Sequence, residues 1–165
     1  IMKNKFRIFQ IFALVIIMAS CKKDAFNGLS DVRPAVPVTI TNAIDYRPEP
    51  TVSTSKSGGG AIQIILSIPS ASGRTIKEVT RIAASTNFTK IQGTTGLYNS
   101  APIPVNATTY TFNTTLAEYV VKGPGVIPTV SATVGTELSN RFYFMLTLDD
   151  GAVIISEPVR VLVMN

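Results

Sequence analysis

The 165-residue sequence has no histidine, no tryptophan and a single cysteine. Without histidine, these residues cannot support Ser-His-Asp or Cys-His catalysis, and with one cysteine they lack the ligands of most zinc and transition-metal sites. One cysteine also excludes an intrachain disulfide. Without tryptophan, tyrosine is the side chain that combines a flat apolar face, able to pack on a sugar ring, with a polar group.

Charge is also sparse, at 15% of the residues. The net charge of +5 comes from 15 basic and 10 acidic residues. Three basic residues lie within the first twenty, which leaves 12 basic against 10 acidic residues and a net charge of +2 for the rest. Beyond Lys22 and Lys23 no basic cluster follows, so nucleic acid is not an expected partner. We expect these two lysines to meet anionic lipid headgroups.

Residues 1–20 have the three parts of a secretory signal. Positive charges at Lys3, Lys5 and Arg7 precede an apolar run over residues 8–18, and small residues follow this run. The run is 11 residues long, whereas a transmembrane helix needs about 20. The pattern therefore predicts a signal peptide rather than a membrane-spanning anchor.

The stretch Met18-Ala19-Ser20-Cys21 resembles a bacterial lipobox, in which an aliphatic and two small residues precede a cysteine that becomes acylated. This resemblance implies that Cys21 is the lipid attachment point and the N-terminus of the mature chain. Each buried acyl CH₂ contributes about 0.8 kcal/mol, and one acyl chain alone binds a membrane marginally. Lipoproteins of this class carry two or three chains, which implies stable attachment. We expect this covalent lipid and no cofactor or metal.

Residues 21–35 are interpreted as the lipidated cysteine and a flexible tether, because turn formers and prolines replace any sustained periodicity. From residue 36 to residue 165 the pattern predicts one β domain. Alternating apolar residues mark the strands, most clearly at Ile62, Ile64, Leu66 and Ile68. The other marked runs are Tyr110 with Phe112, Val130 with Ala132 and Val134, Phe142 with Phe144, Leu146 and Leu148, and Val159 with Val161 and Val163.

Local signals refine this pattern. The alternation slips near Glu78 and Val79, which predicts a β-bulge. The stretch Asp149-Asp150-Gly151 between two apolar runs predicts a hairpin. Residues 115–121 predict one short helical turn, and no longer helical stripe is present. Strands at this spacing without helices indicate an all-β fold, a single antiparallel β-sandwich of immunoglobulin-like type. Tyr119, after the short turn, resembles the tyrosine corner of such sandwiches.

Four tyrosines are candidates for a ligand platform, and Tyr143 is expected to be the most exposed because it faces opposite to its phenylalanine neighbours. The alternative for each is packing in the core or at its rim. The four candidates are Tyr46, Tyr98, Tyr110 and Tyr143.

Several strands carry apolar residues on both faces, whereas a sandwich buries one face of each sheet. The surplus predicts an interface patch, with coverage by loops as the alternative. The residues concerned are Ile65, Met145, Leu162 and Met164.

Residues 141–151 (RFYFMLTLDDG) and 158–163 (PVRVLV) resemble the C-terminal hairpin of short envelope lipoproteins with an immunoglobulin-like or fibronectin-type β-sandwich. Such proteins occur in Gram-negative bacteria with extensive polysaccharide-uptake systems. The resemblance implies an outer-membrane location, on the periplasmic or the cell-surface face, and an accessory role in glycan capture. It carries over no binding residue.

We therefore expect a non-enzymatic outer-membrane lipoprotein that serves as a binding or scaffolding module. Its expected partners are the membrane, through the acyl chains, and either a polysaccharide or an envelope protein. The alternative is a subunit of a larger envelope assembly that docks through the apolar strand faces. A carboxylate-based hydrolase is a distant alternative, since two acids can hydrolyse glycosides but the ten acids here form no such motif.

Overall fold

The computed structural model describes residues 34–165 with the exception of residue 124. Met18, Ala19, Ser20 and Cys21, the rest of the predicted signal peptide and nearly all of the tether lie outside the described residues. In order along the chain, the elements are β1 (Thr39–Ile40), β2 (Thr51–Ser55), β3 (Ala61–Ser67), η1 (Ser70–Ser72), β4 (Ile76–Ser85), η2 (Phe88–Gln92), β5 (Ile103–Ala107), β6 (Thr109–Thr115), α2 (Leu116–Lys122), β7 (Thr136–Glu137), β8 (Arg141–Leu148), β9 (Val153–Ile155) and β10 (Arg160–Met164).

The strands form three hydrogen-bonded sheets, which we name after a central strand of each. The β3 sheet has the order β1-β3-β6, the β8 sheet has the order β5-β4-β8-β9, and the β10 sheet has the order β2-β10-β7. All strand pairs are antiparallel except β2 and β10, which run parallel. The predicted antiparallel sandwich is confirmed apart from this one pair, which is parallel because the last strand leaves β8 after its bridge from Val159 to Phe142 and continues beside β2.

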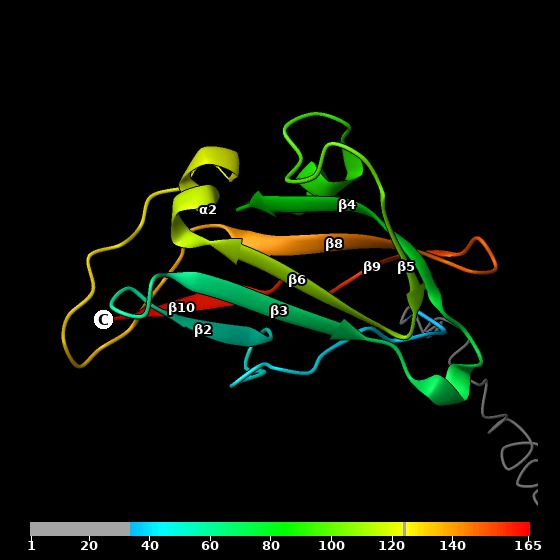
Figure 1. Ribbon diagram of the computed structural model, residues 1–165, viewed down its shortest axis with the longest axis horizontal. Coiled ribbons are helices and arrows are strands. Elements are labelled where there is room, and N and C mark those ends of the chain that lie inside the picture. Colours follow the sequence, from blue (N-terminus) through cyan, green and yellow to red (C-terminus); the bar gives the residue numbers. More distant parts are fainter. Residues whose placement is uncertain (1–33, 124) are drawn as a thin grey trace, which may run out of the picture. The chain divides into compact units, whose positions relative to one another are not determined.

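The β3 and β8 sheets form the two layers of a sandwich, with β3 and β6 in one layer and β4 and β8 in the other (Figure 1). In immunoglobulin-type sandwiches one sheet contains strands A, B, E and D, and the other contains C, F and G. Here β1, β3 and β6 take positions A, B and E, while β4, β8 and β9 take positions C, F and G. Among the described residues no strand takes position D beside β6. The all-β prediction is confirmed.

Alternation places the core between these two layers. Ile62, Ile64 and Leu66 are buried on the inner face of β3, opposite Phe142 and Phe144 of β8. Burial of each such side chain contributes about 1.5–3 kcal/mol relative to exposure. The period-2 pattern of the sequence therefore marks the face of each strand that holds the sandwich together.

Three local predictions are also confirmed. The pairing of β4 with both neighbours shifts register between Ile76 and Glu78, where the bulge is expected. Gly151, at a φ of 85°, turns the chain between β8 and β9. The short helix α2 begins at the predicted turn, where the Thr115 hydroxyl accepts a hydrogen bond from the Glu118 N–H at 3.1 Å. This is the capping that a threonine provides at a helix N-terminus.

The predicted strand around Val130, Ala132 and Val134 is wrong. Residues 125–135 run without strand structure past β10, and pairing resumes at β7 (Figure 1). Ile127 and Val130 pack against the core in part. The alternation here reflects a loop that buries some side chains along the sandwich, which a period-2 pattern does not distinguish from a strand.

Tyr119 fixes the connection from α2 to β8. Its side chain is fully buried, and its hydroxyl accepts a hydrogen bond from the Asn140 N–H at 3.1 Å. The tyrosine corner bonds a backbone group a few residues upstream, whereas Tyr119 bonds one that lies downstream, immediately before β8.

Within residues 34–165, apart from the gap at 124, no helix is long and apolar enough to span a bilayer.

Candidate functional site

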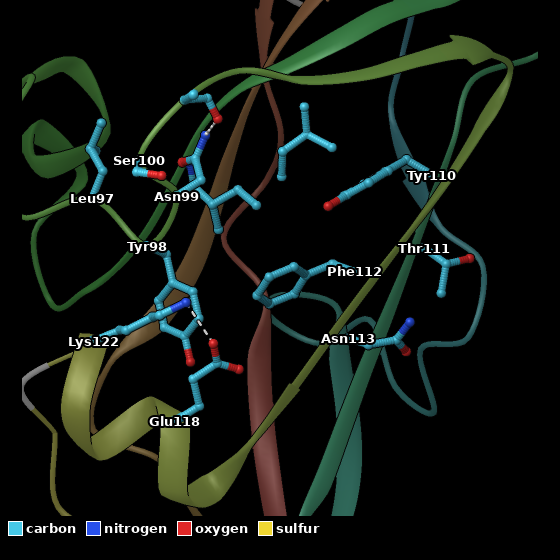
Figure 2. Close-up of a pocket in the computed structure, with 13 residues that line it drawn as sticks. Leu97, Tyr98, Asn99, Ser100, Tyr110, Thr111, Phe112, Asn113, Glu118 and Lys122 are labelled. Atoms are coloured by element: carbon cyan, nitrogen blue, oxygen red, sulfur yellow. Dashed lines mark hydrogen bonds and ion pairs between the residues drawn. The ribbon is translucent and has the colours of Figure 1, made fainter.

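A groove of about 730 Å³ lies along the edge of the sandwich next to β6. Residues 110–113 of β6 form one wall, and residues 97–101 with Ile103 form the other. Figure 2 shows Tyr110 and Phe112 reaching into the groove from β6, and Glu118 and Lys122 closing one end from α2. The groove therefore brings aromatic rings, hydroxyl and amide groups and one ion pair to a single opening.

The backbone of β6 presents unpaired groups to this groove. The Ile68 N–H donates to the Thr108 carbonyl at 2.9 Å, and the Leu116 N–H donates to the Gly60 carbonyl at 2.8 Å. Together with the register that pairs Ile64 with Phe112, these bonds place the even-numbered residues of β6 in hydrogen-bonded pairs with β3. The N–H and carbonyl groups of Thr111 and Asn113 consequently point away from β3, toward the open edge.

Tyr98 joins the two walls. Its N–H donates to the Ile82 carbonyl at 2.7 Å, and its hydroxyl lies 2.7 Å from the Thr114 hydroxyl on β6. Thr114 donates to the Glu118 carboxylate at 2.8 Å. Because a hydroxyl carries one proton, Tyr98 must be the donor to Thr114. Lys122 completes the network, since its ammonium lies 2.6 Å from the Glu118 carboxylate and 5.3 Å from the centroid of the Tyr98 ring.

Two members of this network have pKa values that are shifted in opposite directions. Burial is the largest cause that raises the pKa of Tyr98, to about 12, so its hydroxyl remains a proton donor throughout the neutral range. The hydrogen bonds from Lys122 and Thr114 lower the pKa of Glu118, which keeps the carboxylate ionised. Both shifts favour the donor directions that the geometry requires.

Asn99 holds the second wall in place. Its side-chain oxygen accepts a hydrogen bond from the Ile82 N–H at 2.7 Å, and its amide nitrogen donates to the Ala101 carbonyl at 2.8 Å. The Asn99 side chain thus replaces the backbone carbonyl that would otherwise accept a hydrogen bond from the Ile82 N–H of β4. These bonds occupy the groups of Asn99 that face the strand, so its role is to shape the groove.

The structure brings two of the four predicted tyrosines together. Tyr98 and Tyr110 both line the groove. Tyr98 is only 5% exposed, whereas Tyr110 is half-buried and offers part of its side chain to the opening. Tyr46 lies elsewhere; it is 50% exposed, and its hydroxyl donates to the Ile40 carbonyl.

The expected exposure of Tyr143 is wrong. Its side chain is 4% exposed and packs with Ala83 and Ile91 on the outer face of the β8 sheet. Phe88 of η2 lies over it, with ring centroids 5.8 Å apart in an edge-to-face arrangement. A loop therefore covers the second face of β8, and Tyr143 offers no ring face to a ligand.

The apolar residues on the outer strand faces are also mostly covered. Met145 packs against the cluster under η2, and Ile65 and Leu162 are half-buried. Met164 is exposed to 37%. The described strands therefore do not form the broad apolar patch that alternation alone predicts.

Sequence reasoning missed Thr111, Asn113, Glu118 and Lys122 as groove residues. The run of uncharged residues through β6 was visible, but the sequence does not say that this strand lies at an open edge.

Among the described residues, no group of three or more acidic, histidine or cysteine side chains is placed to hold a metal ion. Comparisons with models of protein families, with curated proteins and with solved structures found no match.

Proposed function

We propose that the chain is an exported lipoprotein, held on the outer membrane through acyl chains on Cys21, and that its β-sandwich is a non-enzymatic binding module of an envelope assembly. The signal-like residues 1–20 and the lipobox support the location. The groove beside β6 is the proposed binding site.

The observation that carries this proposal is the open edge of β6 facing a groove. The volume of about 730 Å³ falls within the range of roughly 300–1,000 Å³ typical of ligand sites. The edge supplies backbone donors and acceptors at Thr111 and Asn113, and Tyr110 and Phe112 supply apolar surface. Directional polar groups beside an apolar wall are the usual composition of a binding site.

The chemistry of the lining supports binding over catalysis. Glu118 is the one acid among the residues that line the groove, and Lys122 and Thr114 already engage its carboxylate. Glycoside hydrolysis needs a second carboxylate about 5–10 Å away. The groove therefore lacks the pair that the hydrolase alternative requires.

Site-specific photo-cross-linking in native envelopes tests the proposal. A photoreactive phenylalanine analogue at position 111 projects from the open edge strand β6 on the outer face of the β3 sheet, beside the groove. The same analogue at the exposed Val153 of β9 serves as a matched control on the other sheet. We expect one discrete adduct from position 111 and none from position 153. No adduct at position 111, or the same adducts at both positions, would contradict a binding role for the groove.

An accessory role in glycan capture is the second candidate, and Tyr110 is the observation that favours it. Its half-buried ring lines the groove together with Ser100, and a flat ring near a hydroxyl suits a sugar ring and its hydroxyls. Affinity electrophoresis against envelope and dietary polysaccharides tests this role. Tyr110→Ala should abolish retardation while Tyr46→Ala retains it; equal behaviour of the two variants would exclude this role for the groove.

A further inference from the structure

We propose that the groove accepts an extended segment of another polypeptide, which adds to β6 as a fourth strand of the β3 sheet. The inference rests on the proposed function in that it names the partner class for the same groove. The added strand would take position D, beside the strand in position E, which no described strand occupies.

The edge of β6 lacks the features that normally prevent strand addition. Natural edge strands are blunted by charged residues, prolines, bulges or short length. β6 is seven residues long, contains no charge, proline or glycine, and pairs with β3 without a register shift. Its threonine, tyrosine and phenylalanine residues have high β propensity. An unprotected edge beside a groove is the arrangement into which peptide strands add.

The register predicts the pattern of the incoming strand. Its backbone would exchange hydrogen bonds with Thr111 and Asn113, whose N–H and carbonyl groups face the opening. A residue opposite Phe112 would direct its side chain inward, toward the apolar wall that includes Ile82 and Ile103. Its neighbours would point outward beside the Thr111 and Asn113 side chains. The partner segment is therefore about five residues of alternating apolar and small polar side chains.

Charge favours a neutral segment. Glu118 and Lys122 are the charged residues of the lining, and they neutralise each other at the end of the groove next to α2. Size favours a single strand over a second copy of this chain. Thirteen residues line the groove, whereas two globular partners typically bury about 20–30 residues on each side.

Peptide binding to the full lipidated chain in detergent micelles tests the inference. The probe is a fluorescein-labelled heptapeptide, Thr-Val-Thr-Val-Thr-Val-Thr, measured by fluorescence anisotropy. In one control peptide the backbone nitrogens of the threonines are methylated, and in the other those of the valines are methylated. In an added strand that runs antiparallel to β6 with its valines inward, the threonine N–H groups face β6. We expect threonine methylation to weaken binding about tenfold or more, since several backbone hydrogen bonds are lost, and valine methylation to change it less than about twofold.

A protein variant tests the same hydrogen bonds from the other side. Thr111→Pro removes an N–H that faces the open edge, a position where strands tolerate proline. Thr111→Ala retains this N–H and is the matched control. We expect Thr111→Pro to weaken peptide binding about tenfold and Thr111→Ala by less than about twofold. If Thr111→Pro fails to fold, the comparison of the two methylated peptides decides alone.

Other outcomes overturn the inference in distinguishable ways. Equal affinities for the two methylated peptides would show that the backbone of β6 is not the acceptor. A dimer in detergent that Thr111→Pro converts to a monomer would identify a second copy as the occupant. Polysaccharide binding that depends on Tyr110, without peptide binding, would exclude strand addition but leave the binding module intact. If position 111 also yields no cross-linked adduct in native envelopes, the proposed function fails as well.

Discussion

The hydroxyl of Tyr98 lies 2.7 Å from the hydroxyl of Thr114 and links the two layers of the sandwich at their open edge. Tyr98 is bonded through its backbone to β4, and Thr114 lies on the inner face of β6. The contact continues to Glu118 and Lys122 on α2. This series of hydrogen bonds therefore holds the two walls of the groove in place at the end next to α2.

Removing this hydroxyl should destabilise the sandwich without changing its fold. We expect Tyr98→Phe to lower the free energy of unfolding by about 1 kcal/mol, the net value of one buried hydrogen bond. Urea unfolding of residues 22–165 measures the change, with an unchanged m value indicating that the surface exposed is the same. Tyr110→Phe is the matched control, since the Tyr110 hydroxyl makes no hydrogen bond within the described part of the chain; an equal loss in both variants would refute the role of this contact.

The raised pKa of Tyr98 predicts a loss of stability at high pH. Burial raises this pKa from 10.0 to about 12, so the folded chain retains the proton at pH values where the unfolded chain releases it. The contribution is complete below pH 10 and is lost as the pH rises through about 12. The difference in unfolding free energy between the parent and Tyr98→Phe should therefore shrink over this interval. A difference that is constant from pH 9 to pH 12 would argue against a buried, neutral phenol.

Sequence patterns predicted the core strands because burial there follows a simple period. In β3 and β8 every second residue is apolar, and those residues are the ones that face each other across the sandwich. The bulge in β4 and the hairpin at Gly151 were also predictable, since each depends on a few neighbouring residues. Local order was therefore readable from local sequence.

The groove was not predictable, because it depends on which strands lie at an edge. Nothing in the sequence of β6 says that β3 covers one of its sides and that the other stays open. Alternation predicts that Tyr143 is the most exposed of the four candidate tyrosines, with core or rim packing as the alternative, and the structure shows that Phe88, 55 residues earlier, covers it. Such long-range coverage is decided by tertiary packing and leaves no periodic signal.

Gly125 passes so close to Tyr119 that a larger residue should not fit. A Cβ atom at position 125 would overlap the Tyr119 hydroxyl oxygen, whereas at Gly93 the nearest atom would be 3.5 Å away. We expect Gly125→Ala to lower the free energy of unfolding by about 1–3 kcal/mol, the usual cost of overpacking, and Gly93→Ala to have little effect. Chemical unfolding of both variants measures this. Equal stabilities would contradict the close approach to Tyr119.

The cover over Tyr143 makes a chemical prediction. Tetranitromethane should modify the half-exposed Tyr46 in the parent protein and spare Tyr143, which lies under Phe88. Phe88→Ala removes this ring and should make Tyr143 reactive, while Tyr119 in the core stays protected. Peptide mapping by mass spectrometry after a short reaction reads each site. Rapid nitration of Tyr143 in the parent would mean that η2 does not cover the outer face of β8.

The central claim of the proposed function is that acyl chains on Cys21 attach the sandwich to a membrane. Mass spectrometry of the N-terminal peptide from the protein purified out of its native membrane tests it most directly. We predict a mature chain that starts at Cys21 and carries the mass of its acyl chains, and a Cys21→Ser variant that stays unprocessed and unacylated. A native chain that begins at another residue, or an unmodified Cys21, would contradict the claim.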